Sequence, residues 1–388
     1  MNDFDVIVVG GGLVGAATAL ALGQGGLRLA LVEQAPPVPL PQDDSWDPRI
    51  YAITPGNVDF LRRLGVWDTL DASRIAPIHA MSVWGDDGQS RLEFDPYEAG
   101  VAELGCIVES RLLQDGLWQA LQRQENVDLV CPARCATLQL SVDSARLGLE
   151  DGRELRAQLI VGADGSGSWV RRQAGIDVTT WPYRQLAVVA NFETEKAHDS
   201  IARQWFLRDG ILAWLPLPGN RISMVWSAFE ERADALLQLD ARAFCESVAQ
   251  AGQHALGMLR LVTPPAAFPL RLQRNDAVMD LKLALVGDAA HQVHPLAGQG
   301  VNLGFRDVQT LAVTLLDRGR RDLGDRLLLR RYERARKADI LAMQAVTTGL
   351  QKLFNNDGPW LGWLRNTGLA LTDRTTSLKR RLMARAIV

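Results

Sequence analysis

The segment Asp5-Val-Ile-Val-Val-Gly10-Gly-Gly-Leu-Val-Gly15-Ala-Ala-Thr-Ala-Leu-Ala-Leu22 contains an apolar run, a glycine-rich turn and a run of small, apolar residues. The first run predicts a parallel strand that is buried on both faces, and the last predicts a helix. The turn has Gly-x-Gly-x-x-Gly spacing. Gly10 allows the tight turn, Gly12 lets the backbone approach a pyrophosphate, and Gly15 lets the helix pack close to the strand.

A second predicted strand, Arg28-Leu-Ala-Leu-Val32, is followed at once by Glu33. An acidic residue about twenty positions beyond the glycines is the expected partner of a ribose hydroxyl. Glycines alone are compatible with a turn that binds nothing. The two strands, the glycine turn and the acid together predict a dinucleotide-binding unit.

Two later stretches repeat the pattern of a strand followed by glycine and aspartate. Leu159-Ile-Val-Gly-Ala-Asp164-Gly165 leads into a basic helix start, and a strand from Leu283 to Val286 runs into Gly287-Asp288. A turn rich in Pro, Gly and Asn then precedes a helix that starts near Asn302. A carboxylate and free backbone N–H groups at this helix start favour a polar ligand chain. For Asp164 and Gly165, an ordinary Asp-Gly turn stays equally open.

We call the turns at Gly10–Gly15, Asp164–Gly165 and Gly287–Asp288 the three glycine-bearing corners. Together they resemble the single-component flavin-dependent aromatic hydroxylases related to para-hydroxybenzoate hydroxylase. Within that group the chain resembles the ubiquinone-biosynthesis hydroxylase family over nearly its whole length. The most specific element is His294-Pro-Leu-Ala-Gly-Gln-Gly-Val-Asn-Leu-Gly304, which carries the family signature without interruption. The resemblance implies FAD as cofactor, with its ADP part on the first motif and its ribityl chain and ring on the last.

The resemblance also implies which residues surround FAD. The expected cofactor-binding residues are Gly10, Gly12, Gly15, Glu33, Arg49, Arg111, Asp164, Gly165, Asp288, Gly300, Val301 and Asn302. A loop near the flavin ring would offer backbone N–H groups where negative charge develops on reduction; its expected members are Pro295, Gly298, Gln299 and Gly300. Without the resemblance, Arg49 reads as a surface arginine and Arg111 as a solvated charge in a first helical turn.

The middle of the chain changes character, because short β-like runs replace strand–helix alternation from about Pro182 to Pro269. We predict an α/β protein with a discontinuous, Rossmann-like FAD-binding domain, an interleaved antiparallel-sheet substrate domain and a C-terminal helical region. The FAD-binding domain is expected to comprise residues 1–77, 96–181 and 270–330. The substrate domain comprises 78–95 and 182–269, and the C-terminal helical region comprises 331–388. Trp205, Trp214 and Trp226 are candidates for substrate contact, although core packing explains most aromatic residues here.

Composition favours a cytoplasmic enzyme without a metal. The chain has 388 residues, of which 47% are hydrophobic and 22% charged. It lacks a signal-peptide pattern and an apolar run of about eighteen residues that would span a membrane. Its 4 Cys show no metal-ligand spacing. We expect His291 and His294 to form backbone hydrogen bonds or to lie near the flavin, and not to bind a metal. Nothing indicates a nucleic-acid partner.

Positive charge gathers at the C-terminus, where residues 315–388 carry 16 Lys+Arg against 7 Asp+Glu. Apolar residues such as Trp360 and Trp363 are interleaved with these charges. Such a segment suits an anionic membrane surface, here the inner membrane, or a partner in a quinone-biosynthesis complex. A helical layer packed on the FAD domain, with a solvated basic face, is the alternative. A homo-oligomer is also open.

The resemblance implies a monooxygenase in which NAD(P)H reduces FAD, O2 then forms a flavin hydroperoxide, and its distal oxygen hydroxylates an aromatic ring. The cofactor carries the difficult step, so no catalytic triad is needed. We predict a polyprenylated phenol of ubiquinone biosynthesis as substrate. Three alternatives stay open: a small aromatic acid held by Arg203 or Arg221, a non-catalytic flavoprotein of a quinone-biosynthesis complex, and another FAD oxidoreductase. A halogenase is disfavoured, because no Trp-x-Trp-x-Ile-Pro segment occurs.

Overall fold

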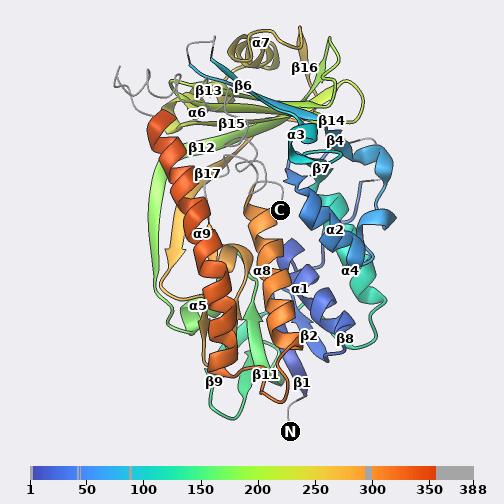
Figure 1. The fold of residues 1–388 in the computed structure, drawn as a ribbon, viewed down its shortest axis with the longest axis vertical. Coiled ribbons are helices and arrows are strands. Elements are labelled where there is room, and N and C mark those ends of the chain that lie inside the picture. Colours follow the sequence, from blue (N-terminus) through green and yellow to red (C-terminus); the bar gives the residue numbers. More distant parts are fainter. Residues whose placement is uncertain (1–2, 42, 44, 87–89, 293–298, 355–388) are drawn as a thin grey trace.

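A mostly parallel sheet forms the lower half of the molecule in Figure 1. The structure is a computed structural model that describes residues 3–41, 43, 45–86, 90–292 and 299–354. The strand order is β18-β19-β11-β1-β2-β8, and β10 and β9 add an antiparallel hairpin beside β11. The strands are β1 (Phe4–Val9), β2 (Leu29–Val32), β8 (Val127–Val130), β9 (Cys135–Leu140), β10 (Ala145–Leu149), β11 (Glu154–Gly162), β18 (Met279–Asp280) and β19 (Leu283–Leu285).

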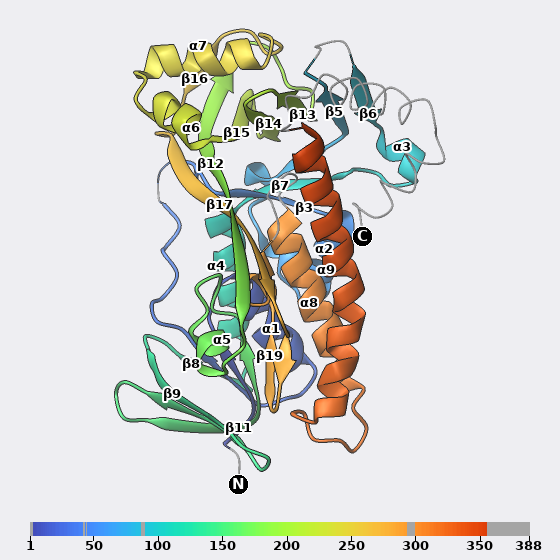
Figure 2. The same ribbon diagram turned by 90° about the vertical axis from the view of Figure 1, so that its left-hand side faces the viewer.

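Both faces of this sheet are covered, which explains why β1 is apolar without alternation. Val6 and Val8 pack into the core on one face, and Ile7 and Val9 pack into the core on the other. The first face is covered by long helices, and the second by the β9–β10 hairpin and a short helix (Figure 2). These helices are α1 (Leu13–Gln24), α4 (Ser110–Gln122), α8 (Gln299–Leu316) and α9 (Arg326–Phe354), and then α5 (Trp169–Gln173).

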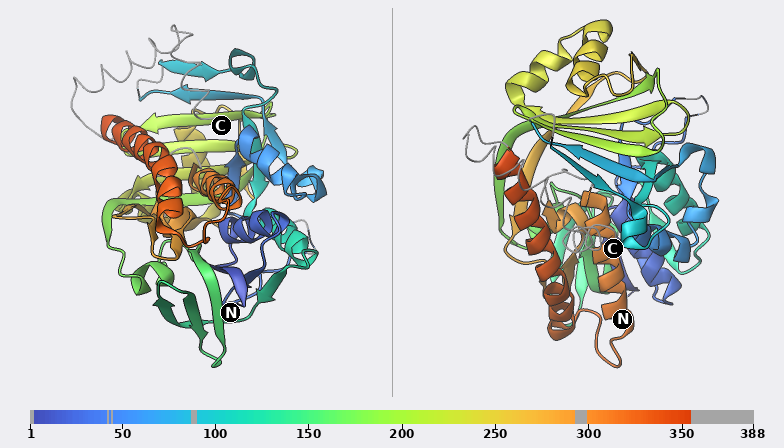
Figure 3. Two further views of the ribbon diagram at one scale, coloured as in Figure 1. Left: turned by 60° about the horizontal axis from the view of Figure 1, so that its bottom comes forward. Right: turned by 45° about the horizontal axis from the view of Figure 1, so that its top comes forward.

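A second, mainly antiparallel sheet lies above the first, in the order β20-β17-β12-β15-β14-β13-β5-β6, with β16 beside β12. Two helices, α6 (Glu230–Leu237) and α7 (Ala241–Ala251), cover its outer side (Figure 3). Its strands are β5 (Ala80–Trp84), β6 (Arg91–Phe94), β12 (Val178–Thr194), β13 (Ile201–Leu207), β14 (Gly210–Leu217), β15 (Arg221–Phe229), β16 (Leu259–Leu261), β17 (Ala266–Asn275) and β20 (His291–Gln292).

A small third sheet, in the order β3-β7-β4, joins the two layers. Apolar residues of this sheet, including Ala76, Ile78 and Ile107, share a core with Ala202 and Leu217 of the upper sheet. Its strands and the neighbouring short elements are β3 (Ile50–Ile53), α2 (Pro55–Arg63), η1 (Trp67–Thr69), η2 (Ala72–Arg74), β4 (Ala76–Ile78), α3 (Pro96–Ala99), β7 (Gly105–Glu109) and η3 (Gly287–Ala289).

The predicted α/β fold, with a Rossmann-like part and an interleaved antiparallel sheet, is confirmed. The strands β5 and β6 come from residues 80–94 and pair into the upper sheet through β13, far from the rest of that sheet in sequence. In the part of the chain that the structure describes, no helix is both long enough and apolar enough to cross a membrane.

Glycine lets α8 approach α1 closely. A Cβ on Gly304 would lie 2.5 Å from Val14 Cγ2, whereas a Cβ on Gly300 would have no neighbour within 4 Å. We expect Gly304→Ala to lower the free energy of unfolding by about 1–3 kcal/mol through overpacking. Gly300→Ala, in the same helix, should be neutral or slightly stabilising. Urea unfolding measures both, and equal losses would contradict this account of the helix contact.

Candidate functional site

The three glycine-bearing corners lie side by side, because they follow three neighbouring strands of one parallel sheet. The strands β1, β11 and β19 are adjacent and parallel, so their carboxyl ends meet at the same edge. The contact between the first two corners is direct, since a Cβ on Gly10 would lie 2.5 Å from the carbonyl oxygen of Ala163. The third is joined to the second by a hydrogen bond from Val286 N to Gly162 O, 3.0 Å long.

The amino terminus of α1 is open in front of the first corner. Gly12 is the N-cap, no side chain caps the helix, and the first turn contains no acidic residue. A Cβ on Gly12 would meet nothing within 4 Å, whereas one on Gly15 would lie 1.9 Å from Gly10 O. Gly15 is therefore required by packing, and Gly12 borders free space beside unpaired helical N–H groups. This arrangement fits a pyrophosphate.

The glycine loop is held in shape by three side chains from outside it. Glu33 accepts a hydrogen bond from Gly11 N. The carbonyl oxygen of Gly11 accepts from Gln114 Nε2 at 2.6 Å and from Trp118 Nε1 at 2.8 Å. Sequence reasoning missed Gln114 and Trp118, although their spacing of four residues on an amphipathic helix puts them on one face. A ribose contact by Glu33 stays a prediction.

Asp47 brings the two predicted arginines together. Its carboxylate accepts from the backbone N–H of Arg49 at 2.9 Å and from that of Arg111 at 3.1 Å. The Nε atom of Arg111 also lies 3.4 Å from this carboxylate. The Arg49 guanidinium lies over the Phe268 ring, 5.2 Å from its centroid. Asp47 is buried and was not identified from the sequence, because its partner Arg111 is 64 positions away.

The carboxylate of Asp164 is used within the protein. It accepts hydrogen bonds from Ser168 Oγ, Trp169 N and Val170 N, at 2.5, 2.7 and 3.0 Å, and so caps α5. Any contact of Asp164 with a cofactor would therefore come from its backbone. The next residue, Gly165, has a positive φ of 79°, and a Cβ there would meet nothing within 4 Å.

Arg171 ties the second corner to the third. This buried residue donates from Nη1 to Ala289 O at 3.0 Å and from Nη2 to Ser166 O at 2.8 Å. Both acceptors are backbone carbonyls of the loops that follow β11 and β19. The sequence showed only a basic helix start at this position, and the structure shows that Arg171 fixes the spacing between the two loops.

Asp288 lies on the third corner and is exposed to solvent. The surrounding protein is nevertheless dense, and desolvation raises the pKa of its carboxyl above the ordinary value. The neighbouring His291, Gln292 and Arg49 oppose this rise without cancelling it. An accessible carboxyl group with a raised pKa is the behaviour expected on the wall of a concave surface.

The start of α8 is clamped to the third sheet. Asn302 is fully buried; its Oδ1 accepts from Thr54 N at 3.0 Å and from Asn57 Nδ2 at 2.9 Å, and its Nδ2 donates to Ala52 O at 2.7 Å. Val301 is part of the apolar core. The side chains of both predicted residues are thus used for packing, and only their backbones can meet a ligand. Pro295, Gly298 and the side chain of Gln299 lie outside the described residues.

The prediction that Trp205, Trp214 and Trp226 contact substrate is corrected by the structure. Each is 1% exposed and packs in the core between the upper sheet and α6 and α7. Trp205 and Trp226 are both paired with Leu212, which places them on the same side of the sheet. Residues that alternate with these tryptophans along each strand therefore point to the opposite side of the upper sheet, toward the parallel sheet. These half-buried residues include Ala213, Leu215 and Val225.

Both arginines suggested for a substrate carboxylate have partners within the protein. Arg203 pairs with Trp214 in the sheet, so it points to the helix side. It donates from Nη1 to His198 O and Ile201 O, at 3.0 and 3.1 Å. Arg221 forms an ion pair with Glu193 at 3.7 Å.

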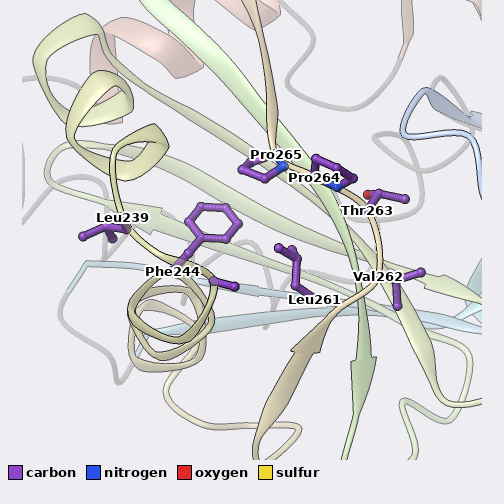
Figure 4. A pocket seen from close by; sticks show the side chains of 8 residues that line it. Leu239, Phe244, Leu261, Val262, Thr263, Pro264 and Pro265 are labelled. Carbon is purple, nitrogen blue, oxygen red and sulfur yellow. The ribbon is translucent and has the colours of Figure 1, made fainter.

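A separate apolar hollow lies on the helix side of the upper sheet, away from the glycine corners (Figure 4). Its volume is about 390 Å³. Its lining contains no titratable side chain and consists of Leu239, Ala241, Phe244, Leu261, Val262, Thr263, Pro264 and Pro265. This hollow offers no chemistry, and the candidate site rests on the edge formed by the three corners. Among the described residues, no group of three or more His, Cys, Asp or Glu residues could hold a metal ion.

Comparison with known proteins agrees with the geometry of the site. The FAD binding domain family matches residues 3–347. The 3-demethoxyubiquinol 3-hydroxylase of Escherichia coli (strain K12) is 38% identical, covering 99% of this chain and 98% of the relative. Ubiquinone hydroxylase UbiL of Rhodospirillum rubrum is 39% identical, covering 99% and 89%. The crystal structure of P. aeruginosa PqsL in complex with 2-aminobenzoylacetate shares the fold, with a TM-score of 0.80, 24% identity, and coverage of 96% and 100%.

The free space at Gly12 gives a test of the nucleotide site. Gly12 has φ −66° and ψ −178°, which alanine adopts readily, so Gly12→Ala should keep its thermal stability. The methyl group would occupy the space beside the helix N-terminus, and we expect FAD affinity to fall at least about tenfold, a loss of about 1.4 kcal/mol. Fluorescence titration with FAD measures this.

Gly15→Ala is the contrasting variant, because its methyl would strike Gly10 O. It should lose both stability and FAD affinity. Unchanged FAD affinity in Gly12→Ala would mean that no pyrophosphate crosses the start of α1.

Proposed function

The chain belongs to the FAD-dependent ubiquinone-biosynthesis hydroxylases, and from this we propose that it hydroxylates the ring of a polyprenylated phenol with O2 and NAD(P)H. The observation that carries the proposal is the convergence of three corners at one sheet edge, beneath a face of the upper sheet on which aliphatic residues and uncharged polar residues alternate. FAD, when bound, supplies the redox chemistry by which electrons from NAD(P)H activate O2 and one oxygen atom enters the ring.

The residues of this chain would bind and orient the cofactor. The N–H groups at the start of α1 would hold the pyrophosphate, and the open backbone at Gly12 leaves room for it. Asp47 would keep Arg49 and Arg111 at the edge of the cofactor. The backbone at Gly300, beside which a Cβ would meet nothing, would offer N–H groups at the start of α8, where positive potential stabilises negative charge.

The upper sheet would hold the substrate ring and exclude water. Its face toward the cofactor part carries the half-buried aliphatic residues Ala213, Leu215 and Val225, together with uncharged polar residues such as Gln204 and Ser223. Since Arg203 and Arg221 are engaged elsewhere, this face favours a phenol with an apolar substituent over a small aromatic acid. Both curated relatives described above are named as ubiquinone or demethoxyubiquinol hydroxylases.

A direct assay tests the substrate. Purified protein with FAD, NADH or NADPH, and O2 should convert a prenylated phenol into a product with one more oxygen atom, detected by mass spectrometry. Para-hydroxybenzoate should be a poor substrate. Consumption of NAD(P)H that yields only peroxide with every prenylated phenol would contradict the proposal. Cells that lack the protein should accumulate a quinone precursor short of one oxygen, whereas loss of all late intermediates would favour an assembly role.

The two faces of β15 give a matched pair of variants. Val225→Phe adds bulk on the face toward the cofactor part, and we expect KM for the phenol to rise about tenfold, equivalent to about 1.4 kcal/mol of lost binding, with more peroxide released. Trp226→Phe changes the helix-side core and should lower the melting temperature while KM stays the same. A KM effect confined to Trp226→Phe would restore the tryptophan face as the substrate surface.

The outer surface of α9 supports contact with an anionic membrane, from which a prenylated substrate would come. It presents exposed cations and the 60% exposed Leu327; the cations are Arg326, Arg330, Arg331, Arg334 and Lys337. Each cation near such a surface contributes about 1 kcal/mol. We expect sedimentation with phosphatidylglycerol vesicles at low salt, weakened by high salt and by the pair Arg330→Gln and Arg334→Gln. No binding at low salt would contradict a peripheral location at the inner membrane.

A further inference from the structure

We propose that Asp307 is a positioning residue for the flavin site, and that α9 takes part in that site by holding Asp307 in place through Arg336. Neither residue belongs to a glycine corner, and neither was singled out from the sequence. The inference rests on the proposed function, because it takes the Gly287–Asp288 corner as part of the FAD site.

Asp307 forms a hydrogen bond to the backbone of the third corner. It lies on α8, is fully buried, and accepts a hydrogen bond from the backbone N–H of Gly287, with 2.9 Å between Gly287 N and Asp307 Oδ2. The same oxygen lies 2.7 Å from His291 Nε2. One carboxylate therefore contacts Gly287 and His291, and Asp288 lies between them in the sequence.

The corner needs such support because Gly287 is buried and its backbone N–H group must find an acceptor. Gly287 has a positive φ of 59°, which glycine adopts freely, and a Cβ there would lie 3.1 Å from Val14 Cγ1. Asp307 is that acceptor, so the shape of the corner is determined by a residue 20 positions later in the chain.

Arg336 keeps the carboxylate of Asp307 ionised and oriented. Its Nε donates to Asp307 Oδ1 at 2.7 Å, and both side chains are almost fully buried, at 3% and 0% exposure. Burial alone would raise the pKa of Asp307, but His291 and Arg336 lower it below the ordinary value. A hydrogen bond to an ionised acceptor is shorter and stronger than a neutral one, which suits a carboxylate that positions a backbone amide.

The helix α9 reaches the same region by a second route. Tyr332 donates from its hydroxyl to Leu285 O at 2.8 Å, at the end of β19 and two residues before Gly287. Tyr332 and Arg336 are four apart and therefore lie on one face of the helix. The C-terminal helix thus fixes both the strand and the corner that follows it, although neither of these two side chains contacts Asp288.

The experiment compares Asp307→Asn with Asp339→Asn. In the native protein one oxygen of Asp307 accepts from Gly287 N–H and the other accepts from Arg336 Nε. In Asp307→Asn, an NH2 group replaces one of these oxygens, so one of the two donors loses its acceptor. We expect FAD affinity to fall about 10- to 100-fold, as for hydrogen bonds to charged groups. The absorption spectrum and reduction potential of bound FAD should shift. Asp339 also forms an ion pair with Arg336, but its side chain is 55% exposed. Asp339→Asn should therefore leave all three readouts unchanged.

A merely structural role for Asp307 would give a different result. If Asp307→Asn lowers the melting temperature but binds FAD with unchanged affinity, spectrum and potential, the inference is overturned. If this variant does not fold, Arg336→Lys and Arg336→Met provide the test. The lysine variant keeps the charge and should retain most of the FAD affinity, and the methionine variant should lose it; equal behaviour of the two would overturn the role of Arg336.

These readouts need no phenol, so they separate this inference from the proposed function. If FAD affinity and potential respond as expected while no phenol is hydroxylated, the positioning role stands and the substrate assignment fails. If the phenol is hydroxylated and Asp307→Asn still matches the wild type in every flavin readout, the positioning role fails alone.

Discussion

Parallel pairing of β1, β11 and β19 is the constraint on which the rest of the structure depends. Parallel strands end at the same edge, so the loops that follow them meet there however far apart they lie in the sequence. In this chain the loops begin near residues 10, 163 and 286, and the register of the strands brings them into contact. The antiparallel sheet, the third sheet and α9 are arranged around that edge, and no single corner would form a site without the others.

The sequence predicted this edge well, because its signals are local. An apolar run followed by glycine specifies a buried strand and a tight turn within a few residues, and all three corners carry such a pattern. The face of the upper sheet could not be predicted in the same way. Alternation along a strand shows that every second residue, counted from Trp205, lies on the same side of the sheet as Trp205. It does not show which side meets α6 and α7. Those helices bury the three tryptophans, and the alternate residues face the cofactor part.

The residues that hold the site together were also out of reach. Asp47, Gln114 and Asp307 each bond to a residue that is distant in sequence, by 64, 103 and 20 positions respectively. A single polar residue within a helix or loop carries no local pattern that distinguishes it from a solvated one. Asp164 and Asn302 illustrate the opposite case: the motif identified the positions, but the structure shows that their side chains bond within the protein.

The hydrogen bonds around Gly11 have a thermodynamic consequence for ligand capture. Glu33, Gln114 and Trp118 fix the peptide groups of the first loop through contacts made entirely within the polypeptide. The entropy lost in ordering this loop is therefore spent when the chain folds, and an arriving nucleotide meets a surface that is already rigid. Pre-organisation of this kind lowers the entropy cost of ordering the loop on binding. Tight binding of the nucleotide therefore does not require the loop to close over it.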